Sequence, residues 1–145
     1  MRNKFLFILV GGVILNFLYF GWKFYQNTTR TVIPTDDLEM VTLKEENNQL
    51  FLVGSAKLSQ FEKVSNYGAV QIDDILYIYI MKTKALIKSD SVNENISKIT
   101  VSDSSEPPKK IYLISGGNIE VKYKDNPEMN YMDVTRYSEK RELSK

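Results

Sequence analysis

Residues 5–22 read FLFILVGGVILNFLYFGW, a run of eighteen residues without a formally charged side chain. As an α-helix with about 1.5 Å of rise per residue, this run would be roughly 27 Å long, which is enough to cross the hydrocarbon core of a bilayer. Twelve of the eighteen are Leu, Ile, Val or Phe, and their insertion outweighs the cost of the glycines and of Asn16. The sequence therefore predicts one transmembrane helix, with the lipid bilayer as its first partner.

The same run could instead be a cleaved signal peptide or a buried helix of a soluble protein, since Arg2 and Lys4 give it the basic start that signal peptides share. An uncleaved anchor is favoured because no small-x-small pair follows for a signal peptidase to cut. Tyr19, Trp22 and Tyr25 are typical of the membrane interface, where rings are buried and polar edges are hydrated. We therefore expect a single-pass protein of the cell membrane with a cytoplasmic N-terminus and an extracytoplasmic C-terminal domain.

The first two parts of the chain follow from this helix. Residues 1–22 are predicted to be a cytoplasmic stub and a signal-anchor helix. Residues 23–37 are polar and contain Pro34, so they are predicted to form a linker that lifts the domain off the membrane. Alternatively, Val32 and Ile33 could form a first edge strand, where a following proline is tolerated.

The remaining two parts differ in their apolar patterning. Residues 38–124 carry short apolar runs about ten residues apart, which is typical of a small antiparallel β sandwich or barrel. Residues 125–145 have too few apolar positions to bury a face, although Asn126, Pro127 and Glu128 make a good helix start. This tail is predicted to be a frayed helix or disordered, so the fold class is mainly β with one N-terminal helix and at most a short C-terminal one.

Two hairpins are the strongest features of the predicted β domain. The first joins residues 69–72 to 75–81 (ILYIYIM) around Asp73-Asp74, and the second joins 110–115 to 118–124 around Gly116-Gly117. Both turns are two residues long, as tight hairpins require. Weaker strands are predicted at residues 38–43, 49–53 and 96–101.

Alternation along the 75–81 strand directs its even-numbered residues to the core and Tyr77 and Tyr79 to the opposite face. Tyr112 repeats this pattern in a later strand. Three tyrosines on one sheet face would form an amphipathic patch of the kind that is enriched at binding sites. The alternative is that the strand is central and that a second layer covers the tyrosines.

The amino-acid composition argues against several classes of function. Residues 23–145 contain 17 basic and 18 acidic residues, a balance that does not favour a nucleic-acid partner. The chain has no cysteine and no histidine, which removes thiol chemistry, most zinc sites and the usual base of a catalytic triad. No cofactor, no metal site and no catalytic residue are therefore predicted, and the lack of disulfides outside the cytoplasm suits a bacterial envelope.

The carboxylates that remain do not converge. Asp36-Asp37 and Asp73-Asp74 are adjacent pairs, whose side chains point to opposite sides of an extended chain, so they are interpreted as turn residues. The favoured hypothesis is a membrane-anchored, non-catalytic binding protein with an envelope protein as its partner. Two alternatives stay open: an immunity protein that neutralises a toxin at the outer face of the membrane, and an enzyme that modifies the cell wall or lipids.

Overall fold

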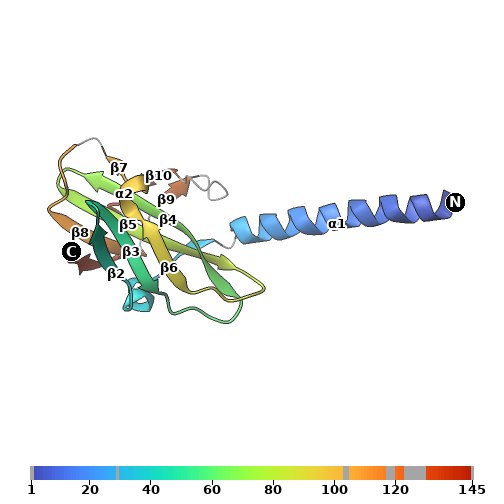
Figure 1. The fold of residues 1–145 in the computed structure, drawn as a ribbon, viewed down its shortest axis with the longest axis horizontal. Coiled ribbons are helices and arrows are strands. Elements are labelled where there is room, and N and C mark those ends of the chain that lie inside the picture. Colours follow the sequence, from blue (N-terminus) through green and yellow to red (C-terminus); the bar gives the residue numbers. More distant parts are fainter. Residues whose placement is uncertain (1, 29, 103–104, 117–119, 123–129, 145) are drawn as a thin grey trace.

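The computed structural model of the 145-residue chain describes residues 2–28, 30–102, 105–116, 120–122 and 130–144. A long N-terminal helix, α1, projects away from a domain made almost wholly of strands (Figure 1). The predicted fold class, an apolar N-terminal helix followed by a mainly β domain, is confirmed. Within the described residues no sheet closes into a barrel, and the domain is an open sandwich.

The helix α1 spans Arg2–Thr28 and so contains the whole predicted transmembrane run. Its segment Asn3–Gln26 has a mean hydropathy of 2.0 and is long and apolar enough to cross a membrane. The most apolar window of this segment is 0% buried inside the described structure. Phe7 and Phe17, for example, are 77% and 75% exposed, so these side chains are not buried against the β domain.

The prediction of a polar linker over residues 23–37 is wrong for most of this range. Residues 23–28 are the last turns of α1, because no proline or glycine interrupts them. The strand β1 (Thr31–Val32) then pairs with the central strand of the domain, and Ile33 is fully buried. The alternative interpretation, an edge strand before Pro34, is the one that the structure shows. A short 3-10 helix, η1 (Thr35–Leu38), follows.

The hairpin of β4 (Glu62–Ile72) and β5 (Ile75–Lys84) is the centre of the fold and confirms the first predicted hairpin. Asp73 adopts the positive φ of 55° that a two-residue primed turn requires. The side chains of β5 alternate between two apolar clusters on opposite faces of the sheet, with Leu76, Ile78 and Ile80 in one and Tyr77, Tyr79 and Met81 in the other. Because both faces are covered, β5 is a central strand.

The sheet around this hairpin is mixed rather than purely antiparallel, which corrects the sequence prediction. Its order is β11-β8-β5-β4-β7, with β1 paired to the end of β5 that β8 leaves free. The strands β8 (Lys110–Ser115) and β7 (Val101–Ser102) run parallel to β5 and β4, respectively. Parallel neighbours need a long crossover, and the chain makes it by passing through a second sheet between β5 and β7.

The second sheet consists of β2 (Thr42–Glu46), β3 (Gln49–Ser55) and β6 (Ser91–Asn95), all antiparallel, and it confirms the strand predicted at 49–53. Asn47 and Asn48 form its first turn with φ of 53° and 63°, which asparagine tolerates better than most residues. Its strands lie in front of the mixed sheet in Figure 1. Buried side chains from both sheets form one apolar core between them, including Leu52, Val92, Ile78 and Leu113.

Two weaker strand predictions are displaced by local polar interactions. Residues 38–43 do not begin a strand at Leu38, because η1 ends there and a backbone hydrogen bond from Val41 N to Leu38 O (3.0 Å) forms a further turn. Residues 96–101 form the helix α2 (Ile96–Ile99) before β7. The side chain of Asn95 caps α2 by accepting a hydrogen bond from Lys98 N at 3.3 Å, so capping wins over the strand propensity of isoleucine.

The C-terminal part of the domain differs most from the prediction. Residues 110–115 pair with β11 (Glu139–Leu143) instead of with a strand at 118–124. The strand β9 (Glu120–Lys122) pairs with β10 (Asn130–Asp133), so the second predicted hairpin is wrong. The tail is therefore built from strands in its described parts and is neither a frayed helix nor disordered there. The helix start predicted at residues 126–128 lies outside the described residues.

Candidate functional site

The three tyrosines predicted to form a binding patch do share one face of the mixed sheet. Tyr77 and Tyr112 are partners in the parallel register of β5 and β8, and their ring centroids are 6.4 Å apart. Their predicted exposure is wrong, however, because Tyr77 is 9% exposed, Tyr79 is 0% exposed and Tyr112 is half-buried. The alternative interpretation, a central strand whose tyrosines are covered, is the one that the structure shows.

The ring of Tyr79 occupies the space that a glycine leaves on the neighbouring strand. Gly68 lies directly opposite Tyr79 in the antiparallel register, and a Cβ built on Gly68 would overlap the tyrosine ring. The φ of Gly68 is not in the left-handed region, so this position requires glycine for space rather than for conformation. Burial raises the pKa of the Tyr79 hydroxyl well above its usual range, which keeps it neutral. Tyr79 is thus part of the core.

A residue from the tail completes the tyrosine cluster. The ring of Tyr137 lies 6.0 Å from that of Tyr77, and Val134 is buried against the same group. Burial, followed by the neighbouring Tyr137 and Tyr112 hydroxyls, raises the pKa of Tyr77. Lys140 Nζ lies 4.7 Å from the ring centroid of Tyr112 and covers part of its remaining surface. The sequence patterns missed Val134 and Tyr137 because they stand in a polar tail.

Polar side chains on the inner face of β11 tie the tail to the N-terminal part of the domain. One Nη of Arg141 donates hydrogen bonds to Leu38 O at 2.5 Å and to Val41 O at 2.8 Å. The Glu139 carboxylate accepts hydrogen bonds from Ser115 Oγ (3.1 Å) and Thr35 Oγ1 (3.3 Å). The contacts of Arg141 with Leu38 and Val41, and of Glu139 with Thr35, join chain segments about a hundred residues apart.

The end of β5 nearest to α1 carries an ion-pair cluster. Glu62 lies 3.3 Å from Lys82 Nζ and 3.8 Å from Lys84 Nζ, and it accepts a hydrogen bond from Ser59 N at 2.9 Å. Burial by itself would raise the pKa of this carboxyl, but the hydrogen bond and the two lysines outweigh it and lower the pKa below the usual glutamate value. Glu62 is therefore a carboxylate at neutral pH and neutralises part of a basic region.

The predicted membrane-interface residues lie in the last turns of α1, beside the domain. Trp22 and Tyr25 are in ring contact with centroids 5.7 Å apart, and Lys23 Nζ is 5.8 Å from the ring of Tyr19. One residue further, Gln26 is buried. Its side-chain Nε2 donates to Lys84 O at 3.1 Å, and its backbone carbonyl oxygen accepts a hydrogen bond from Thr83 Oγ1 at 2.6 Å. These contacts join the end of the helix directly to β5.

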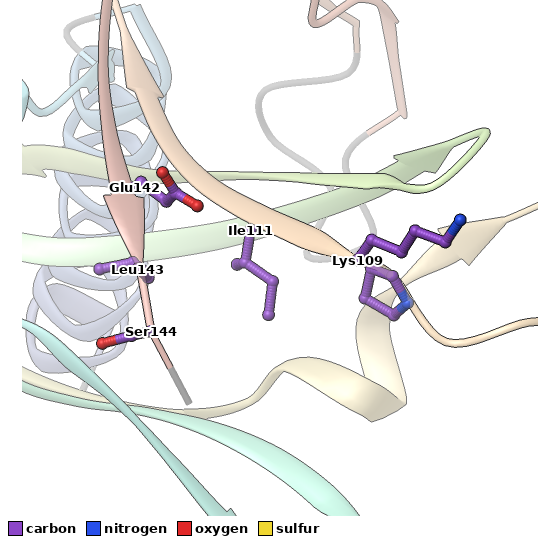
Figure 2. Close-up of a pocket in the computed structure, with 6 residues that line it drawn as sticks. Lys109, Ile111, Glu142, Leu143 and Ser144 are labelled. Carbon is purple, nitrogen blue, oxygen red and sulfur yellow. The ribbon is translucent and has the colours of Figure 1, made fainter.

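A surface depression of about 560 Å³ lies at the opposite end of the domain, where β8 begins and β11 ends (Figure 2). The backbone N–H of Lys109 donates to Asp74 O at 2.7 Å, which places it beside the β4–β5 turn. We call this feature the distal depression. It is lined by Pro108, Lys109, Ile111, Glu142, Leu143 and Ser144.

The distal depression is lined by both apolar and polar side chains. Ile111 and Leu143 are buried and supply apolar walls, while Lys109, Glu142 and Ser144 supply exposed polar groups. In Figure 2 the Lys109 ammonium points away from the Glu142 carboxylate, so the two groups do not converge on one point. Apolar side chains flanked by exposed polar groups are common in protein-binding sites.

The two pairs of adjacent aspartates lie in a short 3-10 helix and in a hairpin turn. Asp36 and Asp37 lie in η1, and Asp73 forms the β4–β5 turn, as the sequence predicted for turn residues. Within the described ranges, no group of three or more acidic side chains could hold a metal ion. No family model, curated protein or solved structure matches this chain. Its function is therefore argued from the geometry above.

Proposed function

We propose that this protein is a single-pass membrane protein whose β domain is a non-catalytic binding module on the outer face of a bacterial cell membrane. The observation that carries this proposal is the uncovered apolar surface of α1 over Asn3–Gln26. Burying one Leu or Phe side chain contributes about 1.5–3 kcal/mol, so a helix with this many of them in contact with water is strongly unfavourable. A bilayer supplies the missing cover, and its thickness matches the length of the helix.

The orientation rests on charge and on the position of the aromatic residues. Arg2 and Lys4 precede the apolar run, which favours a cytoplasmic N-terminus under the positive-inside rule. Trp22 and Tyr25 stand at the other end, beside the β domain, at the depth that interfacial aromatics prefer. Since Gln26 is hydrogen-bonded to β5, the domain sits directly on the membrane surface rather than on a flexible tether.

The distal depression is the surface that supports a binding role best. Because β5 is ten residues long, its two ends are about 30 Å apart, so the depression faces away from the bilayer. Its apolar walls would bury a small apolar group of a partner, and the Lys109 and Glu142 side chains would select complementary charges. We propose an envelope protein as the partner on this account.

Protease added to intact spheroplasts is expected to digest the β domain and leave a membrane-bound stub, because the proposal puts everything after Trp22 outside the cytoplasm. The measurement uses an epitope at the C-terminus and a second one at the N-terminus. Only the C-terminal epitope should disappear.

The control for this experiment is the same treatment after the membrane is permeabilised, which should remove both epitopes. Recovery of the protein in the soluble fraction would contradict the anchor. Survival of the C-terminal epitope until permeabilisation would contradict the orientation and leave the anchor standing.

Reversing the charges at the distal depression is expected to remove the partner. We expect Lys109→Glu with Glu142→Lys to lower the partner recovered from detergent extracts at least tenfold, because both side chains are exposed and change only the surface. The control is Lys44→Glu with Glu46→Lys, an exposed ion pair on β2 whose exchange should change nothing. Equal recovery with both double variants would contradict a binding role for the depression.

A further inference from the structure

Three large apolar side chains are exposed together near the end of α1. Leu86 and Ile87, in the loop between β5 and β6, are 76% and 82% exposed, and Phe61, in the loop before β4, is 57% exposed. The backbone N–H of Ala85 donates to Phe61 O at 2.8 Å, which joins the two loops. We call these three residues the proximal tip. Apolar side chains gathered in this way on a surface indicate a contact with an apolar phase or partner.

The proximal tip lies close to the C-terminal end of α1. Lys84 O accepts a hydrogen bond from the Gln26 side chain, and Leu86 follows only two residues later. The loop that carries Leu86 and Ile87 lies at the end of the domain from which α1 leaves (Figure 1). Gln26 itself is in the helical turn of Trp22 and Tyr25. The tip is therefore at about the depth of the interfacial aromatic residues.

Charge around the proximal tip is complementary to lipid headgroups. Segments 57–63 and 82–90 together contain five lysines and only two acidic residues. Both acids are paired, Glu62 with Lys82 and Lys84 and Asp90 with Lys88, so the lysines remain in excess. The negatively charged phosphate groups of lipid headgroups attract lysines placed in this way.

The backbone conformation of Phe61 agrees with an outward-facing role. Its φ is 86°, in the left-handed region that a bulky aromatic residue seldom adopts. This conformation costs free energy, yet its ring remains more than half exposed and gains little burial in return. Contact of the ring with lipid would recover part of that cost, since aromatic side chains are favoured at the membrane interface.

We propose that the proximal tip is a second membrane contact, in which Phe61, Leu86 and Ile87 enter the headgroup region of the same bilayer that α1 spans. This inference rests on the proposed anchoring of α1. The tip and the helix then contact the bilayer at two separate points, which restrains the rocking of the domain about the end of α1. The distal depression is consequently held facing away from the membrane.

The test measures depth in the bilayer with single nitroxide labels, which can be attached at one introduced cysteine because the chain has no native cysteine. The full-length variant Leu86→Cys is reconstituted in vesicles of phosphatidylcholine and phosphatidylglycerol. The accessibility of each label to oxygen, which enriches in lipid, is compared with its accessibility to a water-soluble nickel chelate. Val101→Cys, at an exposed position near the opposite end of β4, is the control for a site in water. Val13→Cys, in the middle of α1, is the control for a site in lipid.

We expect the oxygen-to-nickel ratio at position 86 to be several-fold higher than at position 101 and below that at position 13. Equal ratios at positions 86 and 101, with a high ratio at position 13, would overturn the proximal tip and leave the anchor intact. A low ratio at position 13 would overturn the anchor, and the proximal tip with it. Ile87→Cys provides an independent second label, which must agree with Leu86→Cys for the inference to stand.

Discussion

Replacing Tyr79 with alanine is expected to lower the free energy of unfolding of the β domain by about 3–5 kcal/mol, the usual cost of removing a buried aromatic side chain. Tyr79 is fully buried in the cluster that also contains Tyr77 and Met81, and its ring lies over Gly68 on the neighbouring strand. The measurement is urea unfolding of the full-length protein in detergent micelles, followed by the circular dichroism of the strands. A change within about 0.5 kcal/mol, as is typical of a surface position, would instead support the exposed tyrosine patch.

A double-mutant cycle with Gly68 separates this packing contact from a general loss of stability. Gly68→Ala alone should cost about 1–3 kcal/mol, because the added methyl group overlaps a ring that cannot move away. In the Tyr79→Ala background the overlap is gone, so the same methyl group should cost much less. Additive effects would show that the two residues do not constrain each other. Tyr79→Phe is the control, because it retains the ring and should therefore retain most of the cost of Gly68→Ala.

The central hairpin could be predicted because it is local in the sequence. Asp73-Asp74 separates two runs of strand-forming residues, and alternation alone assigns Tyr77 and Tyr79 to the same face. What covers that face is a different question, because the covering residues stand far along the chain. Val134 and Tyr137 reach the tyrosines through pairings that no periodicity in residues 75–81 can reveal.

The strand β11 shows why an apolar pattern can fail to find a strand. Its sequence is Glu-Lys-Arg-Glu-Leu, and Leu143 is its only apolar residue. On the inner face, the positions that usually hold apolar residues are taken by Glu139 and Arg141, which bind polar partners on β8, η1 and the turn after it. Hydrogen bonds therefore take the place of apolar burial at these two positions. For this reason the sequence of β11 looks like that of a tail exposed to solvent.

The proximal tip was also hidden in the sequence, for a related reason. Leu86 and Ile87 stand in a short, weakly apolar segment that could equally be the end of a buried strand. The hydrogen bond between Lys84 and Gln26 shows that they lie beside the end of α1. Their exposure shows that they are not part of the apolar core. The transmembrane helix needed no such information, because its length and apolar content are properties of one continuous run.

Removing residues 139–145 is expected to abolish the cooperative unfolding of the β domain. The truncation deletes β11, which pairs with β8 along its whole length, and takes Leu143 out of the core. It also leaves the Leu38 and Val41 carbonyl groups without the hydrogen bonds that Arg141 donates to them. Loss of one buried leucine alone costs about 2–5 kcal/mol, and unpaired buried polar groups add about 1–3 kcal/mol each. The sum is comparable with the 5–15 kcal/mol that stabilises a typical domain.

Two further variants show which part of β11 is responsible. Deleting only the last two residues should leave the unfolding midpoint unchanged, because Ser144 is exposed and follows the strand. Arg141→Met keeps the backbone pairing and removes the hydrogen bonds to η1 and the following turn, so it should destabilise the domain without abolishing its transition. An unchanged transition in the 1–138 chain would mean that the tail is dispensable, as its polar sequence suggests. The structure predicts the opposite, because Arg141 and Leu143 connect the C-terminal strand to the segment that follows α1.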